Sequence, residues 1–212
     1  MIQPNETVYV VDDDQGMRQS LSYLLESVGL RVETFADGNE FLERFDPDRA
    51  GCLILDVRMP GRSGPELQDT LVSLGIDIPI IMITAYGDVP TSTRAMRQGA
   101  IDFLEKPFSE QDLLARVNEA LAEGRERRRL AEERSRLAAR MARLTPRERE
   151  VLDGVVAGKH NKLIAAELGI SPKTVESHRA RVMAKLGASS AAELVRFVCA
   201  YEQAFGRVVA GD

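Results

Sequence analysis

The sequence has little of what marks secreted, metal-bound or membrane proteins. It contains two cysteines in 212 residues, Cys52 and Cys199, and they lie too far apart to form a metal or redox motif. The N-terminus has neither the basic nor the apolar segment of a signal peptide, and no apolar run is long enough to span a bilayer. We therefore expect a reduced, cytoplasmic protein without membrane contact.

Charge is distributed unevenly along the chain. Residues 1–123 carry 10 Lys and Arg against 22 Asp and Glu, a formal net charge of −12. Residues 124–212 carry 18 against 11, a net charge of +7, and the two parts together give the −5 of the whole chain. An acidic half joined to a basic half indicates two domains, of which the second faces nucleic acid or another polyanion.

Short apolar segments alternate with segments of helical period in the acidic half. Strands are expected at 8–11, 30–35, 52–55, 79–84 and 101–104, and helices at 15–28, 38–45, 65–74, 89–98 and from Ser109 onward. This alternation predicts an α/β fold, a doubly wound five-stranded parallel sheet of the flavodoxin-like kind.

Polar residues follow four of the predicted strands, namely Asp12, Asp13, Asp56, Thr84 and Lys106. Because ligands of open α/β sheets bind outside the carboxyl ends of the strands, we expect these side chains to meet at one edge. Three carboxylates together favour a hard divalent cation, most simply Mg²⁺. Asp56 can then act as a nucleophile toward a phosphoryl group, whose oxygens Thr84 and Lys106 contact.

Each of these residues also has an ordinary structural interpretation. The acidic run can cap the following helix, a role that suits Asp14 best, while Thr84 can satisfy a turn and Lys106 can be a solvated charge. The occurrence of the full set at successive strand ends favours phosphoryl transfer.

The motifs VVDDD, LDVRMPG, ITAYGD and DFLEKPF together resemble the receiver domain of bacterial two-component response regulators over about residues 5–122. The resemblance implies that a sensor histidine kinase transfers a phosphoryl group from its phosphohistidine to Asp56. It also implies a Mg²⁺ site formed by Asp13 and Asp56, by Asp12 through water, and by the main-chain carbonyl of Arg58.

The resemblance further implies that Thr84 and Phe103 form a switch pair that reorients on phosphorylation. Phe103 stands where many receivers carry tyrosine, so a hydroxyl hydrogen bond of the active state is lost. Catalysis would be limited to Mg-dependent autophosphotransfer and autodephosphorylation at Asp56, so we do not expect an enzyme. The enzyme alternative, a haloacid-dehalogenase-type phosphohydrolase, needs a second acid where this chain has Arg58.

The segment 121–143 is rich in Ala, Glu, Arg and Leu and lacks proline, which favours helix. We expect a solvated helical linker, interrupted or bent near Gly124. A coiled coil is the alternative, since Leu130, Leu137 and Leu144 fall seven residues apart. Arg134 occupies an intervening core position, so the heptad pattern is incomplete. Contact of the linker arginines with DNA phosphates is a third alternative.

The basic half begins with a helix start at Thr145-Pro146, and further helices are expected at 161–168, 172–186 and 190–205. A short helix, a turn at Gly169 and a longer basic helix are typical of a helix-turn-helix. The motifs LTPREREVL, NKLIAAELGIS and KTVESHRARVMAKLG resemble the all-α four-helix DNA-binding domain of the LuxR/NarL class, over roughly residues 140–204. The receiver and linker resemble most the FixJ/StyR-like subgroup of that class.

The helix at 172–186 has one apolar side, formed by Val175, Val182 and Leu186. The opposite side is expected to face the DNA groove, with Glu176 and Ser177 at base edges and with phosphate contacts from Lys173, Thr174, Arg181 and Lys185. An ordinary amphipathic helix with a solvated polar face is the structural alternative. His160 and His178 have no evident metal partners nearby in the sequence.

These observations predict a receiver domain at 1–122, a linker at 123–143 and a DNA-binding domain at 144–212. The expected function is a transcriptional regulator that dimerises when phosphorylated and binds promoter DNA, with RNA polymerase as a further partner. The alternative is a phosphorylation-controlled module whose helical domain binds protein.

Overall fold

The computed structural model describes residues 6–47, 49–85 and 99–206, and the chain divides into two compact units between Arg129 and Leu130. This division falls inside the expected linker, and the boundaries at 122 and 144 stay a prediction. Within the described residues, no helix is long and apolar enough to cross a membrane.

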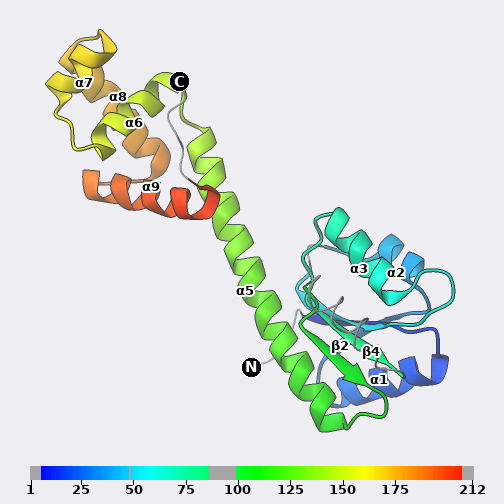
Figure 1. Ribbon diagram of the computed structural model, residues 1–212. Coiled ribbons are helices and arrows are strands. Elements are labelled where there is room, and N and C mark those ends of the chain that lie inside the picture. The colour runs from blue at the N-terminus through cyan, green and yellow to red at the C-terminus, as the bar shows by residue number, and fades with distance from the viewer. Residues whose placement is uncertain (1–5, 48, 86–98, 207–212) are drawn as a thin grey trace. The chain divides into compact units, whose positions relative to one another are not determined.

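The first unit is built on a five-stranded sheet in the order β2-β1-β3-β4-β5 (Figure 1). All neighbouring strands pair in parallel. The strands are β1 (Thr7–Val11), β2 (Arg31–Phe35), β3 (Gly51–Asp56), β4 (Ile80–Thr84) and β5 (Asp102–Glu105). The predicted doubly wound, flavodoxin-like sheet is confirmed, and the central apolar run of β3 is buried along its whole length.

Helices cover both faces of the sheet (Figure 1). On one face lie α2 (Gly38–Arg44) and α3 (Gly64–Ser73), and on the other lie α1 (Gln15–Ser27) and the start of α5 (Glu110–Ala142). Asp14 caps α1, since its carboxylate accepts the N–H groups of Gly16 and Met17, which confirms its structural interpretation. The helix predicted at 89–98 lies outside the described residues.

The helix α5 runs without interruption through Gly124, so the interruption expected near this glycine is wrong, while a bend there stays a prediction. A Cβ at this position would lie 2.9 Å from the Gly51 carbonyl oxygen, so the glycine allows the helix to approach the sheet. Beyond it, Arg125 pairs with Glu6 at 2.7 Å. Residues 129–136 are exposed throughout and form the longest unbroken exposed stretch of α5.

The second unit consists of the end of α5 with α6 (Pro146–Val156), α7 (Asn161–Leu168), α8 (Pro172–Leu186) and α9 (Ala191–Phe205). The predicted helix start at Thr145-Pro146 is confirmed and forms a capping box with Glu148, and Gly169 closes α7 with a left-handed φ of 65°. Leu137 and Met141 of α5 pack into the core of this unit. Arg140 lies 4.9 Å from the ring of Phe197 in α9.

Candidate functional site

Two buried acids lie where the strand order reverses. Asp12 directly follows β1 and Asp56 ends the neighbouring β3, which is the position at which ligands bind in sheets of this topology. The Nζ of Lys106 lies 2.9 Å from Asp12 Oδ2 and 2.7 Å from Asp56 Oδ1. The fold therefore brings together three predicted site residues from three separate strand ends.

Asp12 is held by its main chain as well as by its carboxylate. Its N–H donates to the Phe35 carbonyl at 3.3 Å, and its Oδ1 accepts the N–H of Asp14 at 2.8 Å. The Arg18 guanidinium, from the first turn of α1, donates to the Asp12 carbonyl at 2.6 Å. Sequence reasoning missed Arg18, for which the only signal was an arginine one helical turn after the acidic run.

Burial disfavours the charged forms of both Asp56 and Lys106. Burial raises the pKa of Asp56 above its ordinary value, although hydrogen bonds from Lys106 and from the N–H of Arg58 oppose the rise. Burial lowers the pKa of Lys106, but its hydrogen bonds to Asp56 and Asp12 outweigh this effect and raise it. Lys106 thus stays an ammonium between the two carboxyl groups.

The chain turns back sharply after Asp56. The N–H of Gly64 donates to the Val57 carbonyl at 3.1 Å, and a Cβ on Gly64 would lie 2.3 Å from the Asp56 carbonyl oxygen. The N–H of Arg58 donates to Asp56 Oδ2 at 2.7 Å. The lack of a side chain at Gly64 therefore allows the close turn that follows Asp56.

The other predicted receiver residues surround this centre. Asp13 and the side chain of Arg58 are exposed, while Thr84 is buried and its carbonyl accepts the N–H of Lys106 at 2.7 Å. Phe103 is half-buried and packs against the hydrophobic cluster beneath α2 and α3. Among the residues that the structure describes, no three His, Cys, Asp or Glu side chains surround a common cation position.

The predicted DNA-contact residues lie on α8 in the second unit. Five of them are exposed, namely Lys173, Thr174, Glu176, Ser177 and Arg181. Lys185 differs, because its ammonium lies 2.6 Å from the buried carboxylate of Glu148 in α6. Hydrogen bonds from Lys185 and from the Thr145 N–H lower the pKa of Glu148 to about 2. The predicted phosphate contact of Lys185 therefore competes with its ion pair to Glu148.

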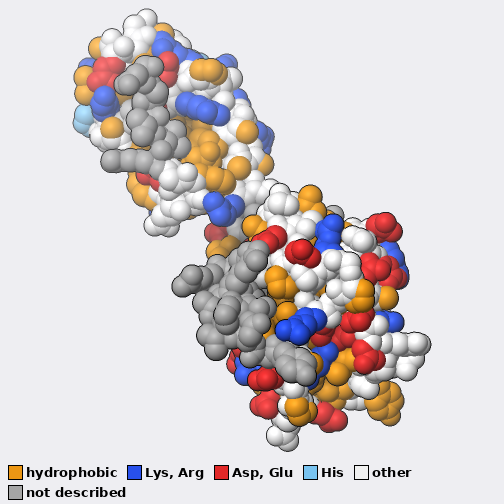
Figure 2. Space-filling model, turned by 45° about the vertical axis from the view of Figure 1, so that its right-hand side comes forward, with side chains coloured by type: hydrophobic (Ala, Val, Ile, Leu, Met, Phe, Trp, Pro, Cys, Tyr) orange, Lys and Arg blue, Asp and Glu red, His pale blue; other side chains and the backbone are white. Residues whose placement is uncertain are grey.

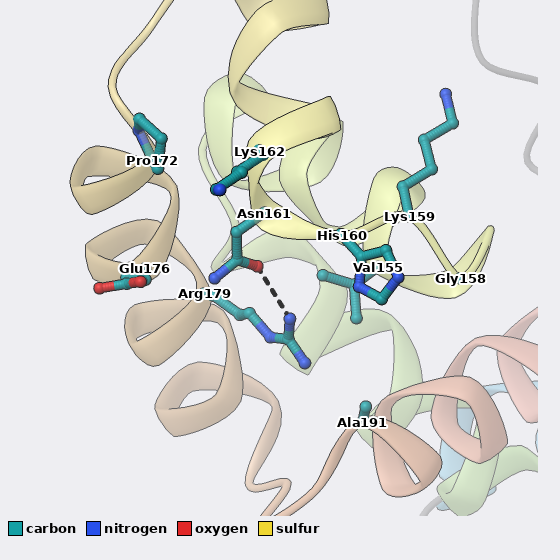
Figure 3. A pocket seen from close by; sticks show the side chains of 10 residues that line it. All are labelled: Val155, Gly158, Lys159, His160, Asn161, Lys162, Pro172, Glu176, Arg179 and Ala191. Atoms are coloured by element: carbon teal, nitrogen blue, oxygen red, sulfur yellow. Dashed lines mark hydrogen bonds between the residues drawn. The ribbon is translucent and has the colours of Figure 1, made fainter.

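A cavity of about 640 Å³ lies between α8, the start of α7 and the start of α9 (Figure 3). Arg179 reaches across it from α8 and donates to Asn161 Oδ1 at 3.0 Å. Lys162 lies on the same side as Asn161, whereas the carboxylate of Glu176 points away from Arg179 (Figure 3). Of the residues that line the cavity, the sequence predicted only Glu176 as a DNA contact. The signal for the others was weak, because it consisted of the lysines at the start of one helix.

Two family models together match most of the chain. The response regulator receiver domain matches residues 8–118, and the luxR family of bacterial regulatory proteins matches residues 142–198. The chain belongs to the luxR-family response regulators. It is a two-component response regulator with a receiver domain and a LuxR-type DNA-binding domain that regulates transcription.

Similar proteins and structures extend over both units. The transcriptional regulatory protein TdiR of Thauera aromatica is 47% identical over 91% of this chain and 85% of its own length. The transcriptional regulatory protein FixJ of Bradyrhizobium diazoefficiens is 45% identical over 89% and 92%. The solved structure of the response regulator StyR is 48% identical, with a TM-score of 0.88, and is matched over 93% of this chain and 100% of its own.

Proposed function

We propose that this regulator accepts a phosphoryl group on Asp56 from a sensor histidine kinase. In the transfer, an Asp56 carboxylate oxygen attacks phosphorus while the phosphorus–nitrogen bond of the phosphohistidine breaks. The electron pair stays with the imidazole nitrogen, which is protonated. The observation that carries the proposal is the Lys106 ammonium, 2.7 Å from Asp56 Oδ1, at the edge where the strand order reverses.

Lys106 and Thr84 would stabilise the phosphoryl group after transfer. The ammonium already lies beside Asp56, so only a small shift brings it to a phosphoryl oxygen. Thr84, at the end of β4, would contact a second oxygen through its hydroxyl. Movement of Thr84 would then allow Phe103, on the adjacent β5, to change its packing.

The donor set of this edge fits a hard cation. Asp12 and Asp56 contact Lys106 and Asp13 directly follows Asp12 in the chain, so these three carboxylates and one ammonium carry a formal charge of −2. Oxygen donors with an excess of negative charge are the surroundings that Mg²⁺ prefers. Asp13, Asp56 and the Arg58 carbonyl would hold it directly and Asp12 through water. When bound, Mg²⁺ neutralises charge on the phosphoryl oxygens.

Phosphorylation would act through a shift between two populations. The phosphorylated receiver favours a homodimer, in which two α8 helices reach adjacent major-groove half-sites of promoter DNA. At the promoter, the bound homodimer would contact RNA polymerase. Support for the DNA partner comes from the exposed polar side of α8 and the +7 charge of residues 124–212.

Sedimentation velocity tests the proposal. With Mg²⁺ and a small phosphodonor, the wild-type chain should shift from monomer to dimer, and Asp56→Asn should not. The wild type and Asp56→Asn are then each titrated onto duplex DNA. Treatment with the phosphodonor should raise the affinity of the wild type but not that of the variant. An equal donor-dependent gain in Asp56→Asn would refute phosphorylation at this residue. If the wild type shows no salt-dependent binding to duplex DNA, a protein partner of the helical domain is favoured instead.

A further inference from the structure

The cations of the second unit fall into two groups. Several are paired with acids, as Lys159 is with Glu167 at 2.7 Å and Lys185 with Glu148 at 2.6 Å. Within residues 6–47, 49–85 and 99–206, no acid pairs with Lys162 or Arg179. Both Lys162 and Arg179 line the 640 Å³ cavity beside α8.

The cavity is lined by donors from two helices: Arg179 of α8 and, on either side of the start of α7, Lys159, Asn161 and Lys162 (Figure 3). The Arg179 guanidinium enters from α8 and is oriented by the 3.0 Å hydrogen bond to Asn161, which fixes one of its nitrogens and leaves others for a ligand. Lys162 belongs to the first turn of α7. His160, the residue before that helix, forms no side-chain capping bond to its first N–H groups.

We propose that this cavity binds one backbone phosphate of the DNA duplex, on the flank of α8 rather than on its groove-facing side. Arg179 and Lys162 supply the charge, and the planar guanidinium suits two phosphate oxygens. Asn161 is a positioning residue that holds Arg179. The inference rests on the proposed DNA-binding function and adds to it a contact that is independent of base sequence.

Among the described residues that line the cavity, Glu176 alone carries a carboxylate, and it does not oppose this occupant. Glu176 lies on the outer side of α8 and points away from Arg179 (Figure 3), so the interior of the cavity is basic. The residue is exposed toward the side that is expected to face the groove. A phosphate in the cavity would therefore set the register with which the outer face of α8 enters the groove.

The test is the salt dependence of binding to a short labelled duplex of random sequence, measured by fluorescence anisotropy with the full-length protein. Each phosphate contact contributes a slope of about −0.9 to the plot of log affinity against log salt. Lys162→Gln and Arg179→Gln should each make this slope shallower by about one. Lys159→Gln, which neutralises a lining lysine already paired with Glu167, is the matched control and should keep the wild-type slope.

Arg179→Lys separates charge from geometry. It should retain the slope but bind several-fold more weakly, because lysine lacks the planar fork that Asn161 orients. Circular dichroism checks each fold, and Lys162, whose side chain is exposed, carries the test if Arg179→Gln is unstable.

Wild-type slopes in both Lys162→Gln and Arg179→Gln would overturn the proposal while DNA binding itself stands. A wild-type protein without salt-dependent duplex binding would instead refute the proposed function. A parallel titration with inorganic phosphate provides a third arm. If phosphate binding depends on Lys162 while duplex binding does not, the cavity is a site for free anions, and the proposal is wrong.

Discussion

At the scale of single residues, buried acids in this protein are each matched to a cation. Asp12 and Asp56 share Lys106, and Glu148, whose side chain is 3% exposed, pairs with Lys185. Such pairs contribute through the penalty that follows when one partner is left alone in a buried position. The Glu148–Lys185 pair joins the first turn of α6 to the last turn of α8, so it also fixes the helix that is expected to enter the DNA groove.

We expect Glu148→Gln to destabilise the second unit by about 2 kcal/mol near neutral pH, because hydrogen bonds to a charged group are lost. The pKa of Glu148 is lowered from 4.5 to about 2, so the wild-type contribution is complete above pH 4.5 and disappears as the pH falls toward 2. The difference between variant and wild type should therefore shrink over this window. Differential scanning calorimetry of the full chain at a series of pH values measures it.

Glu193→Gln provides the matched control. Glu193 stands in the first turn of α9 and accepts the Ser189 N–H at 2.6 Å, but its side chain is 38% exposed and its ion pair with the exposed Arg196 is longer, at 3.7 Å. Its loss should cost much less than the loss of the Glu148 carboxylate, because solvent screens an exposed pair. A pH-independent difference between Glu148→Gln and wild type would contradict the assigned role of the ion pair.

The sequence predicted the residues of the receiver edge better than their partners. Asp56 and Lys106 follow from strand periodicity, since polar residues at the ends of parallel strands must share one edge. Arg18 and the Glu148–Lys185 pair did not follow. Their contacts depend on how helices pack, and Glu148 is separated from Lys185 by 37 positions. Periodicity places a side chain on a face but does not select its partner.

At the scale of elements, α5 shows how packing overrides propensity. Glycine in a helix interior costs about 1 kcal/mol relative to alanine, which is why a break was expected at Gly124. The helix continues because this residue lies against the Gly51 carbonyl and Pro79. The composition of the segment therefore predicted a helix correctly, while its position relative to the sheet was not encoded in any local pattern.

Gly124→Ala distinguishes these two effects by its sign. Propensity alone would stabilise the protein by about 1 kcal/mol, whereas a Cβ at 2.9 Å from the Gly51 oxygen should destabilise it by about 1–3 kcal/mol. Urea unfolding followed by circular dichroism gives the difference. Ser135→Ala, in the exposed stretch of the same helix, should instead be neutral or slightly stabilising. An equal gain in both variants would show that the sheet yields to the new methyl group.

At the scale of the whole molecule, the two halves differ in charge as well as in fold. Acidic side chains gather on the first unit in the face shown in Figure 2, in line with its net charge of −12 through residue 123. The same asymmetry was readable from the sequence, because composition needs no knowledge of packing. The point at which the first unit ends was harder to predict, since α5 supplies core residues to both units.

The domain boundary is therefore the feature that truncation tests most directly. A fragment of residues 144–212 follows the predicted boundary but lacks Leu137 and Met141, which pack into the core of the second unit, and Arg140, which stacks on Phe197. A fragment of residues 130–212 retains all three. Each missing core side chain is worth about 2 kcal/mol or more, so the shorter fragment should unfold at a markedly lower urea concentration. Equal midpoints would mean that the end of α5 covers this domain without stabilising it, and that the domain begins at 144.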